Sequence, residues 1–312
     1  KLVEAVTTLN QVAKTIRKKR INSGAIIFDK SEIKFKLDEK NKPKEVVFKT
    51  AKSANKLIEE FMLLANRRVA EKMKKGKERF VFRVHDQPDE EKLKNLQTVV
   101  KRLGYNLDLK KNNLNDSLNT LLENTFGKNE QNLIDTLMIR SMSKAEYTTK
   151  NIGHYGLAFD NYTHFTSPIR RYPDVLVHRL IEAELKKEKI KTEELETLCN
   201  HSTHMEILAT KAERDSIKLM QIKYMLDKEG KIFEAVISGV TARGVFVEVV
   251  ENKCEGLVKA KDLPGDFYVH DEKNHQFVGE KTGKKYQLGD KTRVMLIKAD
   301  QVKRRLDFQI LS

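Results

Sequence analysis

The spacing of apolar residues divides the chain into two parts, and the first part follows the 3.6-residue period of amphipathic helices. Leu2, Val6, Leu9, Ala13 and Ile16 recur at three- and four-residue intervals, which predicts a helix in the first 20 residues. Further helices are predicted at residues 53–75, 88–102, 115–122, 129–143, 173–185 and 192–226. Short apolar runs at residues 25–28, 33–37, 46–48 and 80–84 have the length of strands. Long helices with a few strands among them indicate an α+β unit with a mixed sheet.

The apolar period changes from 3.6 to two after residue 229. Phe233, Ala235 and Ile237 begin an alternating pattern that is typical of strands and continues to the end of the chain. Glycines separate these short runs, which predicts a small Greek-key barrel of the OB type. The sequence therefore predicts two domains, an α+β unit over residues 1–228 and an all-β OB-fold barrel over residues 229–312.

The segment over residues 151–173 fits neither period. It holds seven aromatic or histidine residues together with glycines and prolines, which predicts a structured loop. The adjacent Arg170 and Arg171 precede a helix that starts with proline, so two guanidinium groups lie near the positive end of a helix, an arrangement that suits a phosphate. Alternatively, the pair forms salt bridges with Asp174 or Glu182 and only holds the loop in place.

The charge balance narrows the class of partner. Sixty basic residues oppose 45 acidic ones, which gives a net charge of +15 and favours a polyanion such as nucleic acid. No apolar run approaches the roughly 20 residues of a spanning helix, so no membrane association is expected. Because the chain opens on Lys1 inside a predicted helix, we expect a further segment upstream. Cys199 and Cys254 fall in different predicted domains without a metal or disulfide spacing, so we expect reduced thiols and a cytoplasmic protein.

One long stretch carries a resemblance to a known family. HYGLAFDNYTHFTSPIRRYPDVLVHR (residues 154–179) resembles the catalytic-domain signature of the RNase R / RNase II (RNB) family. Further similar runs are LIEEFMLLAN (57–66), RVHDQPDEEKL (83–93) and KAERD (211–215), so the resemblance extends to about residue 228. The barrel is similar to the RNA-binding OB module of the ribosomal S1 type that closes these enzymes, and its GVFV run takes the place of the usual glycine-aromatic strand.

The resemblance implies a processive 3'-to-5' exoribonuclease that hydrolyses single-stranded RNA to nucleoside 5'-monophosphates at a two-magnesium site. Mg²⁺ prefers carboxylate oxygens, and the family's cage is a cluster of aspartates early in the domain. The sequence contains no such cluster; its acidic groups at residues 86–91 and 193–196 are typical of helix starts and solvated faces. We therefore expect the Mg²⁺ ligands to lie outside this chain and the chain alone to be inactive. The alternative is a non-catalytic RNA-binding adaptor.

The resemblance also implies roles for single residues. Arg170 is expected to hold the scissile phosphate with Arg171 as its assistant, Glu213 to contact the sugar of a terminal nucleotide, and Glu60 to bind ribose hydroxyls. His154, Tyr155 and Ser167 complete the RNA-binding residues expected in the catalytic part. Helical geometry independently places Glu60 at the edge of an apolar stripe, while Glu59 points away from it.

A second long helix, over residues 192–226, carries an apolar seam. Met205, Leu208 and Ala212 lie on the seam, and the next member is Asp215. This pattern predicts a buried Asp215 with a basic partner. His201 and His204 on the same helix have a spacing that also suits a metal, but a solvated surface is the simpler interpretation.

Aromatic side chains in the barrel are candidates for stacking on RNA bases, which contributes about 1–3 kcal/mol per base. Phe246 faces outward if its neighbours Val245 and Val247 face inward. Phe233 and Tyr268 are further candidates, with Arg305 supplying positive charge, although Phe233 also fits a core position. The expected partner is single-stranded RNA, the ribosome is a second candidate, and a monomer is expected.

Overall fold

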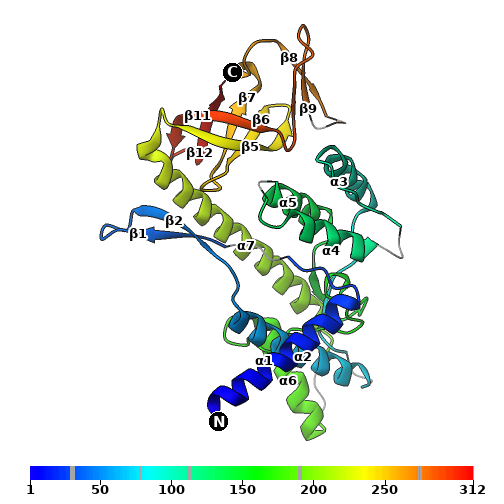
Figure 1. Cartoon of the computed structure of the whole chain (residues 1–312). Coiled ribbons are helices and arrows are strands. Elements are labelled where there is room, and N and C mark those ends of the chain that lie inside the picture. The colour runs from blue at the N-terminus through cyan, green and yellow to red at the C-terminus, as the bar shows by residue number, and fades with distance from the viewer. Residues whose placement is uncertain are drawn as a thin grey trace.

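The computed structural model describes residues 1–28, 32–76, 79–110, 114–128, 130–188, 192–272, 274 and 276–311 (Figure 1). The helices are α1 (Leu2–Asn22), α2 (Ser53–Lys74), α3 (Glu90–Arg102), α4 (Leu114–Thr125), α5 (Gln131–Ser141), α6 (Tyr172–Lys186) and α7 (Leu195–Met225). The strands before the barrel are β1 (Glu32–Leu37), β2 (Pro43–Lys49), β3 (Phe82–Val84) and β4 (Glu146–Thr148). The chain up to α7 thus consists of helices with a few short strands among them, as the apolar period predicted.

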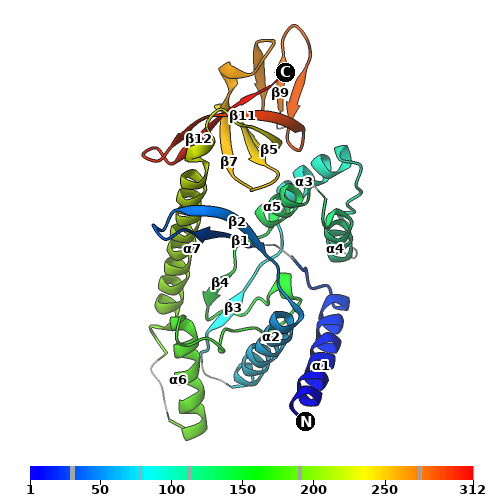
Figure 2. The same cartoon turned by 60° about the vertical axis from the view of Figure 1, so that its left-hand side comes forward.

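The barrel lies at one end of the molecule and α1, α2 and α6 at the other; α3, α4 and α5 lie on the barrel's side of these helices, and α7 runs between the two ends (Figures 1 and 2). Its strands are β5 (Ile232–Thr241), β6 (Gly244–Val249), β7 (Glu255–Lys259), β11 (Lys291–Asp300) and β12 (Arg305–Ile310), closed in the order β11-β12-β7-β6-β5. A second sheet inserted before β11 consists of β8 (Tyr268–Asp271), β9 (Gln276–Gly279) and β10 (Lys285–Gln287). The predicted fold class, an α+β unit followed by an OB-like barrel, is confirmed.

Helix α3 has the cap, the end charges and the buried face that its sequence predicts. The Asp89 carboxylate accepts a hydrogen bond from the backbone N–H of Lys92 at 3.0 Å, which caps the first turn. Glu90 and Glu91 stand at the positive helix end and Lys101 at the negative end. One face of the helix is buried, and it consists of Leu93, Leu96, Val99 and Val100. At α3, the N-terminal cap, the charges at the two helix ends and the apolar spacing all indicate the helix that is observed.

The strand predicted over residues 25–28 does not form, so the first sheet is the two-stranded hairpin β1–β2 rather than a three-stranded element. The backbone of this segment bonds to other groups instead. Ile26 N–H donates to the Gly156 carbonyl at 3.0 Å, and the Asn119 side chain donates to the Ala25 carbonyl at 2.9 Å. The run is apolar because it is buried between α4 and the loop before α6.

The apolar seam predicted on α7 is wrong in its middle section. Leu208 is 54% exposed, and Met205, Ala212 and Asp215 are also exposed. The buried residues of α7 lie instead near its two ends, where the helix packs against β4 and then beneath the barrel. A continuous apolar period along a long helix therefore does not show which of its turns pack against another element of the protein.

The barrel core depends on close packing. A Cβ added to Gly256 would lie 2.5 Å from a ring carbon of Phe308 and from the Leu306 carbonyl oxygen, so only glycine fits there. The Phe308 ring is buried, while Phe267 on the same barrel domain is 70% exposed.

These two phenylalanines give a matched test of the barrel core. We expect Phe308→Ala to lower the free energy of unfolding by about 3–5 kcal/mol, because it removes a buried ring and leaves a cavity. Phe267→Ala should change it by no more than about 0.5 kcal/mol. Urea denaturation followed by circular dichroism measures both; equal effects would contradict the assignment of Phe308 to the core.

Candidate functional site

The loop between β4 and α6, over residues 149–171, packs against β3 and α2. Thr163 Oγ1 donates to the Val81 carbonyl at 2.7 Å, and Arg83 N–H donates to the Tyr162 carbonyl at 2.9 Å. Gly153 adopts a φ of +81°, and a Cβ there would meet the Phe159 carbonyl at 3.2 Å. The loop therefore has one defined path, as expected of a structured segment.

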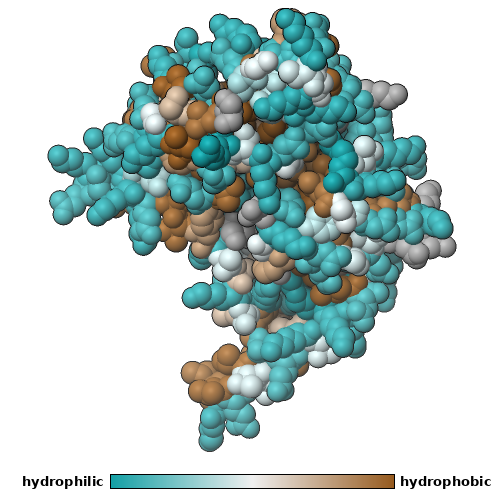
Figure 3. All heavy atoms as spheres, turned by 45° about the horizontal axis from the view of Figure 1, so that its top comes forward, coloured by the Kyte–Doolittle hydropathy of each residue, from teal (hydrophilic) through white to brown (hydrophobic). Residues whose placement is uncertain are grey.

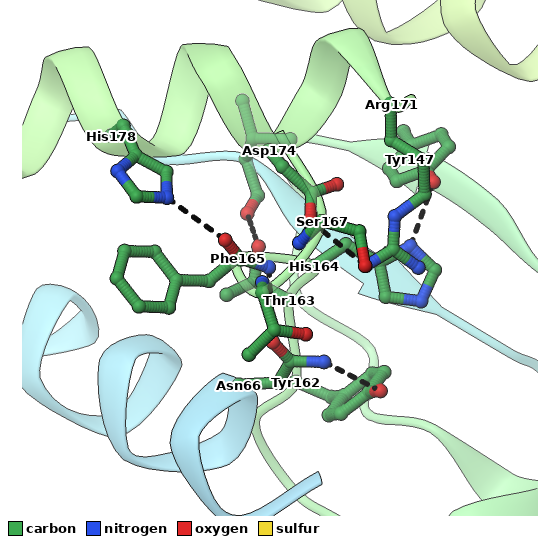
Figure 4. A network of polar contacts seen from close by, with 12 residues as sticks. Asn66, Tyr147, Tyr162, Thr163, His164, Phe165, Ser167, Arg171, Asp174 and His178 are labelled. Atoms are coloured by element: carbon green, nitrogen blue, oxygen red, sulfur yellow. Dashed lines mark hydrogen bonds and ion pairs between the residues drawn. The ribbon is translucent and has the colours of Figure 1, made fainter. Parts of the chain in front are cut away.

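A fully buried carboxylate, that of Asp174 in the first turn of α6, organises the end of the loop (Figure 4). Its Oδ1 accepts a hydrogen bond from Ser167 N–H at 2.7 Å and one from the Arg171 guanidinium at 2.8 Å. The alternative interpretation of Arg171, a salt bridge with Asp174, is what the structure shows. The second oxygen, Oδ2, is buried without a hydrogen-bond partner in the described part of the chain, as is Nε of Arg171.

Arg170 behaves differently from its neighbour. The turn over residues 167–170 carries it to the surface beside Ile169, which is fully exposed. Its backbone N–H donates to the Ser167 carbonyl at 3.3 Å, and no ion pair of its guanidinium is present among the residues that the structure describes. Because Arg171 neutralises Asp174, the charge of Arg170 remains free for a ligand.

Asn66 of α2 holds the middle of the loop. Its Oδ1 accepts from the backbone N–H groups of Phe165 and Thr166 at 3.0 and 3.2 Å, and its Nδ2 donates to the Tyr162 hydroxyl at 3.0 Å. The Phe165 ring stacks on the His178 imidazole of α6 at 4.2 Å between centroids. These contacts join α2, the loop and α6 into one unit (Figure 4).

A cluster of neutral aromatic and imidazole groups lies beneath the loop. The Tyr147 hydroxyl and Nδ1 of His164 are 2.7 Å apart. Burial, aided by the guanidinium groups of Arg171 and Arg83, lowers the pKa of His164 to about 2, and burial raises the pKa of Tyr147 to about 12. Both groups are therefore neutral at pH 7 and act as hydrogen-bonding core.

His154 and Tyr155 also serve the loop. The His154 ring stacks on His85 at 5.0 Å, and burial lowers the pKa of His154 to about 3. The Tyr155 hydroxyl donates to the Asn115 side chain of α4. Both side chains are directed into the protein, and neither points out to the surface where RNA is expected to bind.

A cavity of about 480 Å³ lies between α2 and the loop. Its polar wall includes Asn66, Tyr162, Arg171 and Glu59. The inward orientation predicted for Glu60 is confirmed, since the side chain of Glu60 is 1% exposed and that of Glu59 is 52% exposed. The Glu60 carboxylate, however, is occupied by Arg20 and Arg17 of α1, so Glu59 rather than Glu60 offers a carboxylate to this cavity.

The remaining predicted residues are spread over the molecule. Glu213 is exposed on α7. Phe233 and Tyr268 are buried in the barrel core, so the core position considered for Phe233 is confirmed and the prediction of both rings as stacking platforms is wrong. Phe246 is half-buried on the outer face, since Val245 and Val247 point inward, as predicted. The Arg305 guanidinium is partly exposed and lies 3.3 Å from the Asp307 carboxylate.

The described residues provide no group of three or more His, Cys, Asp or Glu side chains that could hold a metal ion. Those ranges thus do not offer the donor set that a two-magnesium site requires, and among the same residues the exposed His201 and His204 have no third ligand. Cys199 and Cys254 are buried free thiols whose pKa burial raises to about 12. Within the described ranges, no helix is long and apolar enough to cross a bilayer.

Comparisons with known proteins agree with this arrangement. Residues 1–187 match the RNB domain family and residues 226–311 match the S1 RNA-binding domain. The chain therefore belongs to the RNB family and carries an S1 domain at its C-terminal side. The whole of α7 lies between these two matches.

Within that family, the chain is similar to ribonuclease R. It is 38% identical to ribonuclease R of Aquifex aeolicus, over 99% of this chain and 44% of that protein. It is 34% identical to ribonuclease R of Escherichia coli, over 100% of this chain and 40% of that protein. The structure matches the apo form of Mycoplasma genitalium RNase R with a TM-score of 0.93 at 26% identity, covering 99% of this chain and 50% of that one. The chain spans less than half the length of these curated relatives.

The buried histidines predict a pH dependence of stability. The unfolded chain takes up a proton at His164 below about pH 6.5, whereas the folded chain does not until about pH 2. Stability should therefore fall as pH drops from 6.5, by about 1.4 kcal/mol per pH unit for one such histidine. His164→Gln should reduce the slope of unfolding free energy against pH between 6.5 and 4.5. His201→Gln, on the surface of α7, is the control and should leave the slope unchanged; equal slopes in all three proteins would contradict the burial of a neutral His164.

Proposed function

We propose that this chain is the RNA-holding part of a 3'-to-5' exoribonuclease that hydrolyses single-stranded RNA to nucleoside 5'-monophosphates. The observation that carries the proposal is the exposed guanidinium of Arg170, whose neighbour Arg171 already neutralises Asp174. Membership of the RNB family and the similarity to ribonuclease R supply the reaction class.

The turn that carries Arg170 suits a phosphate. Arg170, Arg171 and Asp174 together leave one net positive charge at the start of α6, where the helix dipole also favours an anion. The rigid anchoring of residues 165–167 by Asn66 and Asp174 fixes the turn before a ligand arrives. A preorganised cation loses little energy to reorganisation when charge develops on a phosphate, so Arg170 is the residue proposed to stabilise the transition state.

RNA affinity is proposed to come from both domains. The S1 domain contributes the half-buried ring of Phe246, which is suited to stacking on a base, whereas the Arg305 guanidinium already pairs with the buried Asp307 carboxylate. In M. genitalium RNase R, an arrangement with the same fold has been solved with ribose-methylated single-stranded RNA at a TM-score of 0.93 to this chain. That complex supports single-stranded RNA as the partner of this chain.

The metal ions of the proposed reaction need ligands other than the residues that the structure describes. Enzymes of this kind use Mg²⁺ to position the attacking and leaving oxygens, and the carboxylates for it are not grouped in the described ranges. This chain is therefore assigned binding and charge stabilisation, while the metal ligands are assigned to other residues of the working enzyme. The same observation favours a second candidate function, a non-catalytic RNA-binding adaptor, because a fold alone does not establish catalysis.

The isolated chain should bind single-stranded RNA without degrading it. The turn proposed to bind phosphate and the S1 domain belong to this chain, but the described residues include no group of carboxylates that could hold a metal ion. Affinity should fall steeply between 50 and 200 mM salt, because each phosphate contact releases counterions. Fluorescence anisotropy of a labelled oligonucleotide measures binding, and gel electrophoresis with Mg²⁺ measures degradation. Release of mononucleotides by the purified chain would refute the division of roles, and a flat salt response would refute RNA binding.

The role of Arg170 separates an exoribonuclease from an adaptor. In a chimera that carries this chain in place of the matching part of ribonuclease R, Arg170→Ala should lower the single-turnover rate at least about a hundredfold while RNA affinity changes only a few-fold. Arg170→Lys should restore part of the rate, because ammonium lacks the guanidinium fork.

Arg179→Ala removes an exposed arginine of α6 outside the site and serves as the control. Its rate should match that of the unmodified chimera. A normal rate for Arg170→Ala, or a loss of affinity equal to the loss of rate, would make Arg170 a structural or positioning residue instead.

A further inference from the structure

One turn of the barrel domain, over residues 287–290, enters the space between α3 and α5. Leu288, which follows β10, is buried in a small apolar cluster with Val99 of α3 and Leu133 of α5. The next residue, Gly289, has a φ of +94°, and a Cβ there would lie 3.1 Å from the Leu133 side chain. A larger residue at position 289 would displace α5, so the turn fits closely between the two helices.

The barrel holds this turn rigidly. Gly289 N–H donates to the Ile237 carbonyl of β5 at 2.9 Å, and Ile237 N–H donates to the Asp290 carbonyl at 2.9 Å. The Asp290 carboxylate also accepts a hydrogen bond from Gln287 N–H at 2.8 Å. Because the turn moves only with the barrel, its position between α3 and α5 sets the orientation of the whole S1 domain.

The apolar contact at the turn is small for a junction between domains. Three buried side chains form it, those of Val99, Leu133 and Leu288. Domains joined by a small contact usually move relative to one another, whereas a large apolar junction prevents this. The other connection is α7, whose middle turns are exposed and leave room for bending. The turn is therefore a restraint that can be released while both domains stay folded.

A buried carboxylate, that of Glu248 on β6, lies at the same junction. Helix α5 covers it and leaves a space of only about 40 Å³ against the barrel. The Asn132 side chain of α5 donates to the Glu248 carboxylate, and Lys253 of the barrel pairs with it at 3.2 Å. Glu255 of β7 and Arg140 of α5 line the same space. Glu248 thus faces two cations and a second carboxylate, and its side chain is only 16% exposed.

Ionisation of Glu248 costs more when the junction is closed than when it is open. Burial raises the pKa of Glu248 and the neighbouring Glu255 raises it too, although Lys253 and Asn132 act in the opposite direction. Lys253 and Glu255 belong to the barrel and stay beside Glu248 if the barrel moves away, whereas α5, which excludes water, does not. The pKa of Glu248 is therefore higher in the closed form than in the open form.

We infer that the turn over residues 287–290 is a latch that holds the S1 domain against α3 and α5, and that ionisation of Glu248 favours its release. Protonated Glu248 keeps an acceptor for Asn132 without a buried charge, so the latched form is favoured at acidic pH. This contribution is complete below about pH 4.3, the ordinary pKa of a glutamate, and is lost as pH rises through the raised value. The inference concerns the arrangement of the domains and does not depend on the proposed function.

The distance between two dyes measures the latch directly. Cys199 and Cys254 are buried, so Lys94→Cys on α3 and Lys281→Cys on the barrel domain introduce exposed thiols that can be labelled selectively. Single-molecule energy transfer should show one narrow distance at about pH 5 and a second population with a longer, broader distance by about pH 8. Each pH unit by which latching raises the pKa of Glu248 changes the ratio of the two populations by up to about tenfold.

The role of Glu248 is tested with an isosteric change. Glu248→Gln keeps an acceptor for Asn132 but removes the charge, so the latched population should persist at about pH 8. Glu234→Gln, at an exposed position of β5, is the matched control and should respond to pH like the unmodified chain. If the two variants respond alike, or if the unmodified chain gives one distance at every pH, control by Glu248 is wrong.

The latch itself is tested at Leu288. Leu288→Ala should give the longer distance at every pH, because this side chain belongs to the junction and not to the barrel core. Val269→Ala, which changes an exposed residue of the same sheet, should behave like the unmodified chain, and circular dichroism should show equal melting temperatures to within a few degrees. A short, narrow distance for Leu288→Ala at every pH would overturn the latch. No RNA enters this experiment, so either outcome leaves the proposed function unaffected.

Discussion

The buried carboxylate of Asp174 sets the geometry of the candidate site. Removing a charge from water costs several kcal/mol unless partners satisfy it, and breaking such a pair typically costs about 3–5 kcal/mol. Asp174 meets that requirement with Arg171 and the backbone N–H of Ser167. Because the Ser167 amide is bound from the following helix, the turn over residues 167–170 is held against α6, and its position follows from the satisfaction of one buried charge.

The two adjacent arginines take different roles for the same reason. A guanidinium that neutralises a buried carboxylate is not free to bind a ligand, so Arg171 is committed to the fold and Arg170 is left at the surface. A similar division holds for the adjacent glutamates of α2, where Glu60 is enclosed by Arg20 and Arg17 and Glu59 faces a cavity. In each pair, one residue stabilises the structure and the other remains exposed to solvent.

Local signals in the sequence predicted most of the helices, the barrel and the loop before α6, because caps, periodicity and glycine positions act over a few residues. The predictions failed where contacts between residues far apart in the sequence determine the structure. The apolar run at residues 25–28 is buried by α4 and not by a neighbouring strand. Periodicity placed Glu60 on the inner side of α2 correctly, but nothing in the sequence showed that arginines from α1 would occupy it. Alternation did fit Phe233 to a core position, but nothing in the sequence showed that the Tyr268 side chain is buried in the same core.

Helix α7 has a mechanical consequence for the whole molecule. Its 31 residues make a rod of roughly 46 Å, which begins with Cys199 in the core beside β3 and ends with Ile222 and Met225 in the barrel core. The two domains therefore share one continuous element in place of a flexible tether. A change in their relative orientation has to bend or twist this rod, and a stiff rod transmits torque. A force applied to one domain would load the core of the other, so that the mechanical stability of each domain depends on both.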